Sequence, residues 1–142
     1  MKPLKFILFT LIALQISCSE TRNTLYKEKL NDPELFQAAM QNLTDIIVYD
    51  IFSPPVASRV YLYPTIAAYQ IIANHEPDKY NSLVGQVNEL NEIPKSENQD
   101  INSNLAALFS FNIVGKALIF SEKKMEAFQN EFQKTLEEIK VP

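Results

Sequence analysis

Apolar residues that recur every third or fourth position constrain this chain more than any other feature of its sequence. The clearest case follows Asp32-Pro33-Glu34, which is typical of a helix start: an Asp N-cap, a proline in the first turn and an acidic residue at the positive helix end. Ser53-Pro54-Pro55 predicts where this helix stops, and the same tripeptide can begin the next one. Between the two signals, the apolar residues have the spacing of one helix face: Leu35, Phe36, Ala39, Met40, Leu43, Ile46, Ile47 and Ile51.

The rest of the chain has the same helical character. Residues 56–74 are rich in Ala, Ile and Tyr and contain Pro64, which predicts either one kinked helix or two short ones. Residues 80–90 predict a modest amphipathic helix within a polar stretch. Residues 105–120 are nearly apolar all round, which favours a helix buried on all sides.

Ser121-Glu122 predicts the start of a last, amphipathic helix on the surface. Its apolar stripe consists of Met125, Phe128, Phe132, Leu136 and Ile139. No segment of the chain alternates convincingly with period two, and no Asn-Gly hairpin turn occurs. The prediction is therefore an all-α fold, a helical bundle of about five helices.

The N-terminus has the pattern of an export signal. Lys2 and Lys5 precede the apolar stretch 6–14, which is too short for the ~20 residues that cross a bilayer. Cys18, the sole cysteine, is either incidental to a secretory signal or the acylated first residue of a bacterial lipoprotein. We favour the lipoprotein, because Ser17 suits the preceding position and a lone cysteine has no disulfide partner, although Gln15 departs from the usual aliphatic residue.

This interpretation divides the chain into three parts. Residues 1–17 are expected to be the lipoprotein signal peptide, residues 18–31 a polar tether, and residues 32–142 the helical domain. The expected location is the cell envelope, where the exported chain would be held on a membrane by its lipid rather than span it. Loss of Lys2 and Lys5 with the signal changes the net charge from −4 to −6, and the chain has no basic stripe. Both observations argue against nucleic acid as a partner.

The scarcity of certain residues excludes several classes of site. With one His, one Cys and two Gly, the chain cannot form a Cys₄ or Cys₂His₂ zinc site, an HExxH pair, a dinucleotide fingerprint or a P-loop. His75 has no recognisable nucleophile or orienting acid and is expected to be solvated or to cap a helix. Asp45 and Asp50 lie five residues apart and do not share a helix face. Arg59 is isolated in an apolar segment, and if buried it is expected to pair with one of these two carboxylates.

The remaining candidates are expected to be structural. Tyr61, Tyr63 and Tyr69 are predicted to be core or interface aromatics whose hydroxyls reach polar partners. Gly115-Lys116 lacks the other residues of a phosphate loop, so Gly115 is expected to allow close helix packing. We assign no catalytic, cofactor-binding or metal-binding residue, and Cys18 is the only site residue, for lipidation.

Several strings of the sequence, taken in order, resemble one protein family. They are Asp50-Ile-Phe-Ser-Pro-Pro-Val-Ala-Ser-Arg59, Ile66-Ala-Ala-Tyr69, Ser82-Leu83, Gly85-Gln86, Asn88 and Val114-Gly-Lys-Ala-Leu-Ile-Phe-Ser-Glu122. This order resembles the N-terminal helical region of envelope lipoproteins in the vanadium-dependent haloperoxidase family, part of the phosphatidic-acid-phosphatase type 2 (PAP2) superfamily. The resemblance covers about residues 43–141, and the Ser-Pro-Pro-Val-Ala-Ser-Arg run is its most specific part. It implies an all-α bundle that is half of a larger, two-bundle fold.

In that family, as the resemblance implies, a pocket for vanadate or phosphate lies in the C-terminal half. Three motifs mark it: a Lys followed seven residues later by Arg-Pro, a Pro-Ser-Gly-His run, and a Ser-Arg with a His several residues on. None occurs here, since Ser58-Arg59 has no His at the required distance and His75 is too far along. The implied chain is therefore an accessory front portion, truncated before the catalytic motifs and inactive alone, with vanadate or phosphate bound only in the missing half.

A second hypothesis from another class remains. The chain can instead be a free-standing, lipid-anchored helical module that binds another envelope protein. The expected partners are a membrane through the lipid anchor and either the missing catalytic bundle or a self-associated copy.

Overall fold

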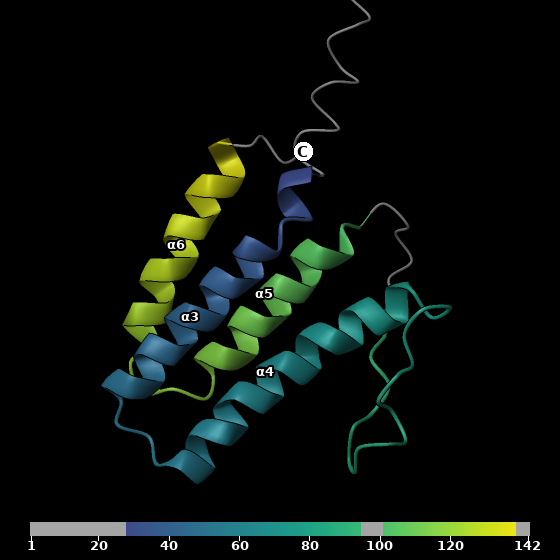
Figure 1. Cartoon of the computed structure of the whole chain (residues 1–142), viewed down its shortest axis with the longest axis horizontal. Helices are drawn as coiled ribbons and strands as arrows, with labels where there is room; N and C mark the ends of the chain where they lie inside the picture. Colours follow the sequence, from purple (N-terminus) through teal and green to yellow (C-terminus); the bar gives the residue numbers. More distant parts are fainter. Residues whose placement is uncertain (1–27, 95–100, 139–142) are drawn as a thin grey trace, which may run out of the picture.

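Four helices make up the bundle in the computed structural model, which describes residues 28–94 and 101–138. They are α3 (Pro33–Tyr49), α4 (Pro54–His75), α5 (Ser103–Lys116) and α6 (Glu122–Glu138). Figure 1 shows them side by side in the order α6, α3, α5, α4. The largest helix–helix contact joins α4 to α5, and α3 contacts each of the other three helices. The all-α prediction is confirmed for the described residues, whose named elements are all helices. Their only β-type pairing is an isolated bridge between Val84 and Val87.

The predicted start of α3 is confirmed in detail. Asp32 is the N-cap, and its carboxylate accepts a hydrogen bond from the backbone N–H of Glu34 at 2.9 Å. Just before it, residues 28–30 form a helical turn, and Leu30 is buried. The remainder of the predicted tether and the whole predicted signal, Cys18 included, lie outside the described residues.

The core is made by side chains from all four helices. Phe111 and Met125 are fully buried, together with Leu43 and Ile46 of α3. The rings of Phe36 and Phe111 meet edge to face with their centroids 5.0 Å apart. Each such side chain contributes about 1.5–3 kcal/mol by leaving water. The apolar face predicted from residue spacing is therefore the face that α3 buries, except at Ile51, which lies beyond the end of the helix and is exposed.

α4 is one continuous helix, which decides between the two forms expected for residues 56–74. Pro64 lies in its interior and is buried. Proline removes one backbone donor, and the Thr65 hydroxyl adds a hydrogen bond to the Tyr61 carbonyl at 2.8 Å in the same turn. A Cβ built on Gly115 of α5 would lie 3.7 Å from Cγ of Pro64 and 3.5 Å from Cε of Met125. The close helix packing expected at Gly115 is present.

The prediction of a helix at residues 80–90 is wrong, and the two described ranges, with four helices, do not confirm the expected count of about five. Segment 76–94 instead folds back along α4 (Figure 1). Gly85 and Glu89 have φ values of 78° and 63°, which a right-handed helix cannot accommodate. The backbone N–H of Leu83 donates to the side chain of Gln70 at 3.0 Å. Hydrogen bonds to side chains of α4 thus take the place of the backbone hydrogen bonds of the helix that the local pattern favoured.

The expectation for residues 105–120 also needs correction. The helix ends at Lys116, and it is not buried on all sides, because Phe109 and Ile113 are 40% and 65% exposed. Its buried face consists of Ala107, Leu108, Phe111, Asn112 and Gly115. None of the helices in the two described ranges is long and apolar enough to cross a membrane.

The turn after α3 stores backbone strain. Ile51 has a φ of 54° although it is β-branched, and its side chain is 88% exposed. Such a conformation costs about 1–2 kcal/mol for most residues but little for asparagine. Ile51→Asn is therefore expected to raise the free energy of unfolding by about 1 kcal/mol, measured by urea denaturation. Ile51→Val, which keeps the β-branch, is the control and is expected to leave stability unchanged; equal stability of the two variants would contradict the strain.

Candidate functional site

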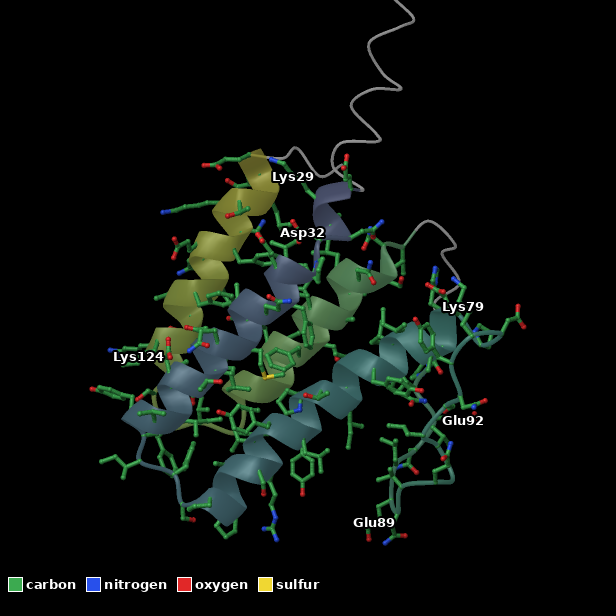
Figure 2. The ribbon with its side chains drawn as sticks, viewed as in Figure 1. Lys29, Asp32, Lys79, Glu89, Glu92 and Lys124 are labelled. Carbon is green, nitrogen blue, oxygen red and sulfur yellow. The ribbon has the colours of Figure 1, made fainter. Side chains whose placement is uncertain are left out.

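Asp50 joins the end of α3 to the start of α6. Its carboxylate accepts hydrogen bonds from the backbone N–H groups of Phe120 at 2.9 Å and Ser121 at 3.1 Å, and from the Ser121 hydroxyl. These donors belong to the two residues that directly precede α6, so the Asp50 side chain anchors the start of this helix from a distant part of the chain, near its positive end. Lys124, labelled in Figure 2, belongs to the first turn of α6. Its Nζ lies over the ring of Tyr49, 4.0 Å from the centroid.

The surroundings of Asp50 favour its charged form. Partial burial raises its pKa, but the hydrogen bonds from Ser121 and Phe120 outweigh that effect, and the positive charge of Lys124 adds to them. The net result is a pKa below the ordinary value for aspartate. This carboxylate therefore acts as a structural anion at a helix N-terminus.

Arg59 does not form the predicted ion pair with Asp45 or Asp50. It is exposed on α4, so its guanidinium has no need of a buried partner. Asp50 is committed to the start of α6, and Asp45 accepts a hydrogen bond from Gln41 at 2.8 Å. The two carboxylates serve different partners, as expected from their spacing. The prediction of a pair failed because it assumed that an arginine in an apolar helix is buried.

The other candidates have structural environments. His75 is exposed in the last turn of α4, as expected of a solvated histidine. Tyr61 donates to the Thr44 hydroxyl at 3.1 Å, and Tyr69 donates to the Asn81 carbonyl at 2.9 Å. Tyr63 differs, because its side chain is 47% exposed on the outside of α4. Two of the three tyrosines therefore match the expectation of a core aromatic with a hydrogen-bonded hydroxyl.

A groove between α3, α4 and α5 was not foreseen from the sequence. Its volume is about 380 Å³, and Asn31 and Asn104 lie at its rim, joined by a hydrogen bond of 2.7 Å. The lining is largely apolar and includes Leu30, Phe36, Ala68, Ile72, Ala107 and Leu108. The residues that make it belong to separate helices and share no sequence motif. Its surface suits an apolar group and offers no charged side chain other than Asp32.

Three cations of the described residues, Lys79, Lys116 and Arg59, do not form a vanadate or phosphate site with one another. An oxyanion of this kind needs several positive side chains that converge on one point. Lys79 is paired with Glu76 at 2.6 Å and Lys116 with Glu126 at 2.7 Å, whereas Arg59 lies on the exposed side of α4. These three cations therefore do not converge on one oxyanion. Residues 28–94 and 101–138 also bring together no group of three potential metal ligands.

Comparison with solved structures places this helical arrangement among haloperoxidase-like folds. The chain is similar to a bacterial vanadium-dependent iodoperoxidase, with a TM-score of 0.70 and 44% sequence identity. The similarity covers 74% of this chain and 25% of the iodoperoxidase, so the chain spans about a quarter of that protein's length. No protein-family model matches the chain, and no curated protein matches it. The resemblance drawn from the sequence motifs is thereby supported at the level of the helical fold.

Proposed function

We propose that this chain is the accessory N-terminal helical portion of a vanadium-dependent haloperoxidase or acid-phosphatase-like envelope protein. In this proposal another part of the larger fold supplies the oxyanion-binding residues, and the chain alone is inactive. The 44% identity to a quarter of an iodoperoxidase is the observation that carries the proposal. The dispersed cations of the described residues and the missing Arg-Pro and Ser-Gly-His motifs agree with it.

The proposal predicts no oxyanion chemistry from the chain by itself. The purified full chain is expected to bind no orthovanadate, measured by equilibrium dialysis. It is also expected to show no peroxide-dependent iodide oxidation and no phosphatase activity. Measurable turnover that survives repurification would contradict the accessory role.

A chimera tests the positive half of the proposal. In it, the matching segment of this chain replaces the corresponding quarter of the iodoperoxidase. Because the two segments share their helical arrangement, with a TM-score of 0.70 and 44% identity, the chimera is expected to fold and to oxidise iodide with vanadate. An unrelated helical bundle of similar size, inserted at the same place, is the control and is expected to give no activity. A chimera whose iodoperoxidase part is folded but which is inactive would favour the alternative, a free-standing module that binds another envelope protein.

We further propose that the chain is a lipoprotein of the cell envelope, anchored through Cys18. The expected product is a mature chain that begins at Cys18 and carries diacylglycerol, detected by mass spectrometry of membrane-extracted protein. Cys18→Ser is expected to move the protein from the membrane fraction to the soluble fraction. Ser17→Ala keeps a small residue before the cysteine and is the matched control. An unmodified protein cleaved elsewhere would refute lipidation.

A further inference from the structure

The outward side of α4 carries apolar residues, as does the side that faces the bundle. Toward the bundle, α4 buries Val60, Pro64 and Ala68. Gln70 lies away from these three on the helix, and it is also buried because segment 76–94 covers it. Its side chain donates to the Ser82 hydroxyl and accepts from the N–H of Leu83. The C-terminal half of the outward side is therefore already covered by this chain's own residues.

The N-terminal half of the same side is uncovered. Val56, Leu62 and Tyr63 are 42%, 51% and 47% exposed, and they share one side of the helix with Arg59 and the half-buried Ile66. We call these five residues the outer face of α4. Apolar side chains of this size exposed together on one helix mark an interaction surface more often than scattered single residues do.

Arg59 is the one charge on the outer face, and it has no ion-pair partner among the described residues. The acidic residues of segment 76–94 do not supply one. Figure 2 shows Glu89 and Glu92 at the outer edge of that segment, and neither is paired with Arg59. A partner that covers the apolar residues must also cover the guanidinium, which costs several kcal/mol unless a carboxylate meets it.

We propose that the outer face of α4 docks a helix from the part of the haloperoxidase-like fold that this chain does not contain, and that this helix carries a carboxylate opposite Arg59. The inference rests on the proposed function. Two observations choose this occupant. The iodoperoxidase has three quarters of its length outside the region shared with this chain, which supplies helices to cover the face. The adjoining half of the same side is already covered by polypeptide, so the docked helix continues an existing layer.

The test compares the same substitutions in the isolated full chain and in the iodoperoxidase chimera. Arg59→Glu and Leu62→Glu are placed on the outer face. Lys134→Glu, on the exposed side of α6, is the control for charge reversal, and Val48→Glu, 71% exposed on α3, is the control for an apolar-to-acid change. Because all four positions are exposed, the isolated chain should keep its melting temperature in every variant.

In the chimera, the two outer-face variants are expected to lower the melting temperature by about 3 °C or more, and the two controls to leave it unchanged. Arg59→Lys, which keeps the charge, should lower it less than Arg59→Glu. Equal behaviour of outer-face and control variants in an active chimera would overturn the docking inference and leave the proposed function standing. A wild-type chimera that neither folds nor oxidises iodide would overturn both. Sedimentation of the isolated chain as a dimer that Leu62→Glu converts to a monomer would identify a second copy as the occupant and overturn the inference alone.

Discussion

Asp50→Ala is expected to lower the free energy of unfolding by about 2 kcal/mol. The substitution removes the acceptor for two backbone N–H groups and one hydroxyl at the start of α6. It also removes the side-chain link between position 50 and Ser121, which lie 71 residues apart in sequence. Urea denaturation at neutral pH measures the loss. Asp45→Ala is the matched control, because this exposed carboxylate of the same helix bonds only to Gln41 and should change stability by less than about 0.5 kcal/mol.

The same carboxylate makes stability depend on pH. The pKa of Asp50 is lower in the folded chain than its ordinary value of about 3.9. Its contribution is therefore complete above that ordinary value and is lost as the pH falls through the lower pKa of the folded state. Wild type should be more stable than Asp50→Asn at pH 7, and the gap should close in acid below the ordinary aspartate pKa. A gap that stays constant across this range would contradict the role of the charged form.

Asn112→Leu is expected to stabilise the chain by about 1–3 kcal/mol. Asn112 is 1% exposed in α5, and neither its carboxamide oxygen nor its nitrogen has a hydrogen-bond partner among the described residues. Leucine, like asparagine, branches at Cγ, so its shape is similar. It removes two polar atoms that are desolvated on folding without forming a hydrogen bond. The gain is measured as a higher urea midpoint with an unchanged slope.

The control for Asn112 is a polar residue of the same type that has a partner. Asn42 is half-buried on α3, and its amide lies 3.4 Å from the sulfur of Met125. Asn42→Leu should therefore give no comparable gain. Backbone contacts of Asn112 are retained in its variant, because Gln129 bonds to the Asn112 carbonyl at 3.5 Å rather than to the side chain. A destabilised Asn112→Leu would show that the carboxamide is satisfied in solution.

The features that could be predicted from the sequence are those that local chemistry determines. The Asp32 cap, the start of α4 after Ser53 and the start of α6 after Ser121 all lie where their capping patterns indicate. The buried face of α3 follows from residue spacing alone. Their positions are indicated by neighbours within a turn or two of the chain, although the start of α6 is also held by Asp50 from the end of α3.

The features that could not be predicted depend on contacts between distant residues. Residues 80–90 have an acceptable helical pattern, but Gln70 and Tyr69 of α4 bind their backbone in another conformation. The role of Asp50 requires knowing that the end of α3 meets the start of α6. Arg59 was assigned a buried ion pair because nothing local shows that one half of an apolar helix faces outward. The groove lined by three helices has no sequence signal for the same reason.

The contact between Pro64 and Gly115 makes the two positions a matched pair. The proline ring, with the side chains of Met125 and Leu43, borders the space that a side chain longer than a methyl group on α5 would enter. Alanine at position 115 meets only ordinary contact distances, the shortest 3.5 Å, so the pair leaves room for one methyl group. Evolutionary change at the two sites should therefore be coupled. Where a relative has a large residue in place of the glycine, the proline should also be replaced, and the two helices should stand farther apart.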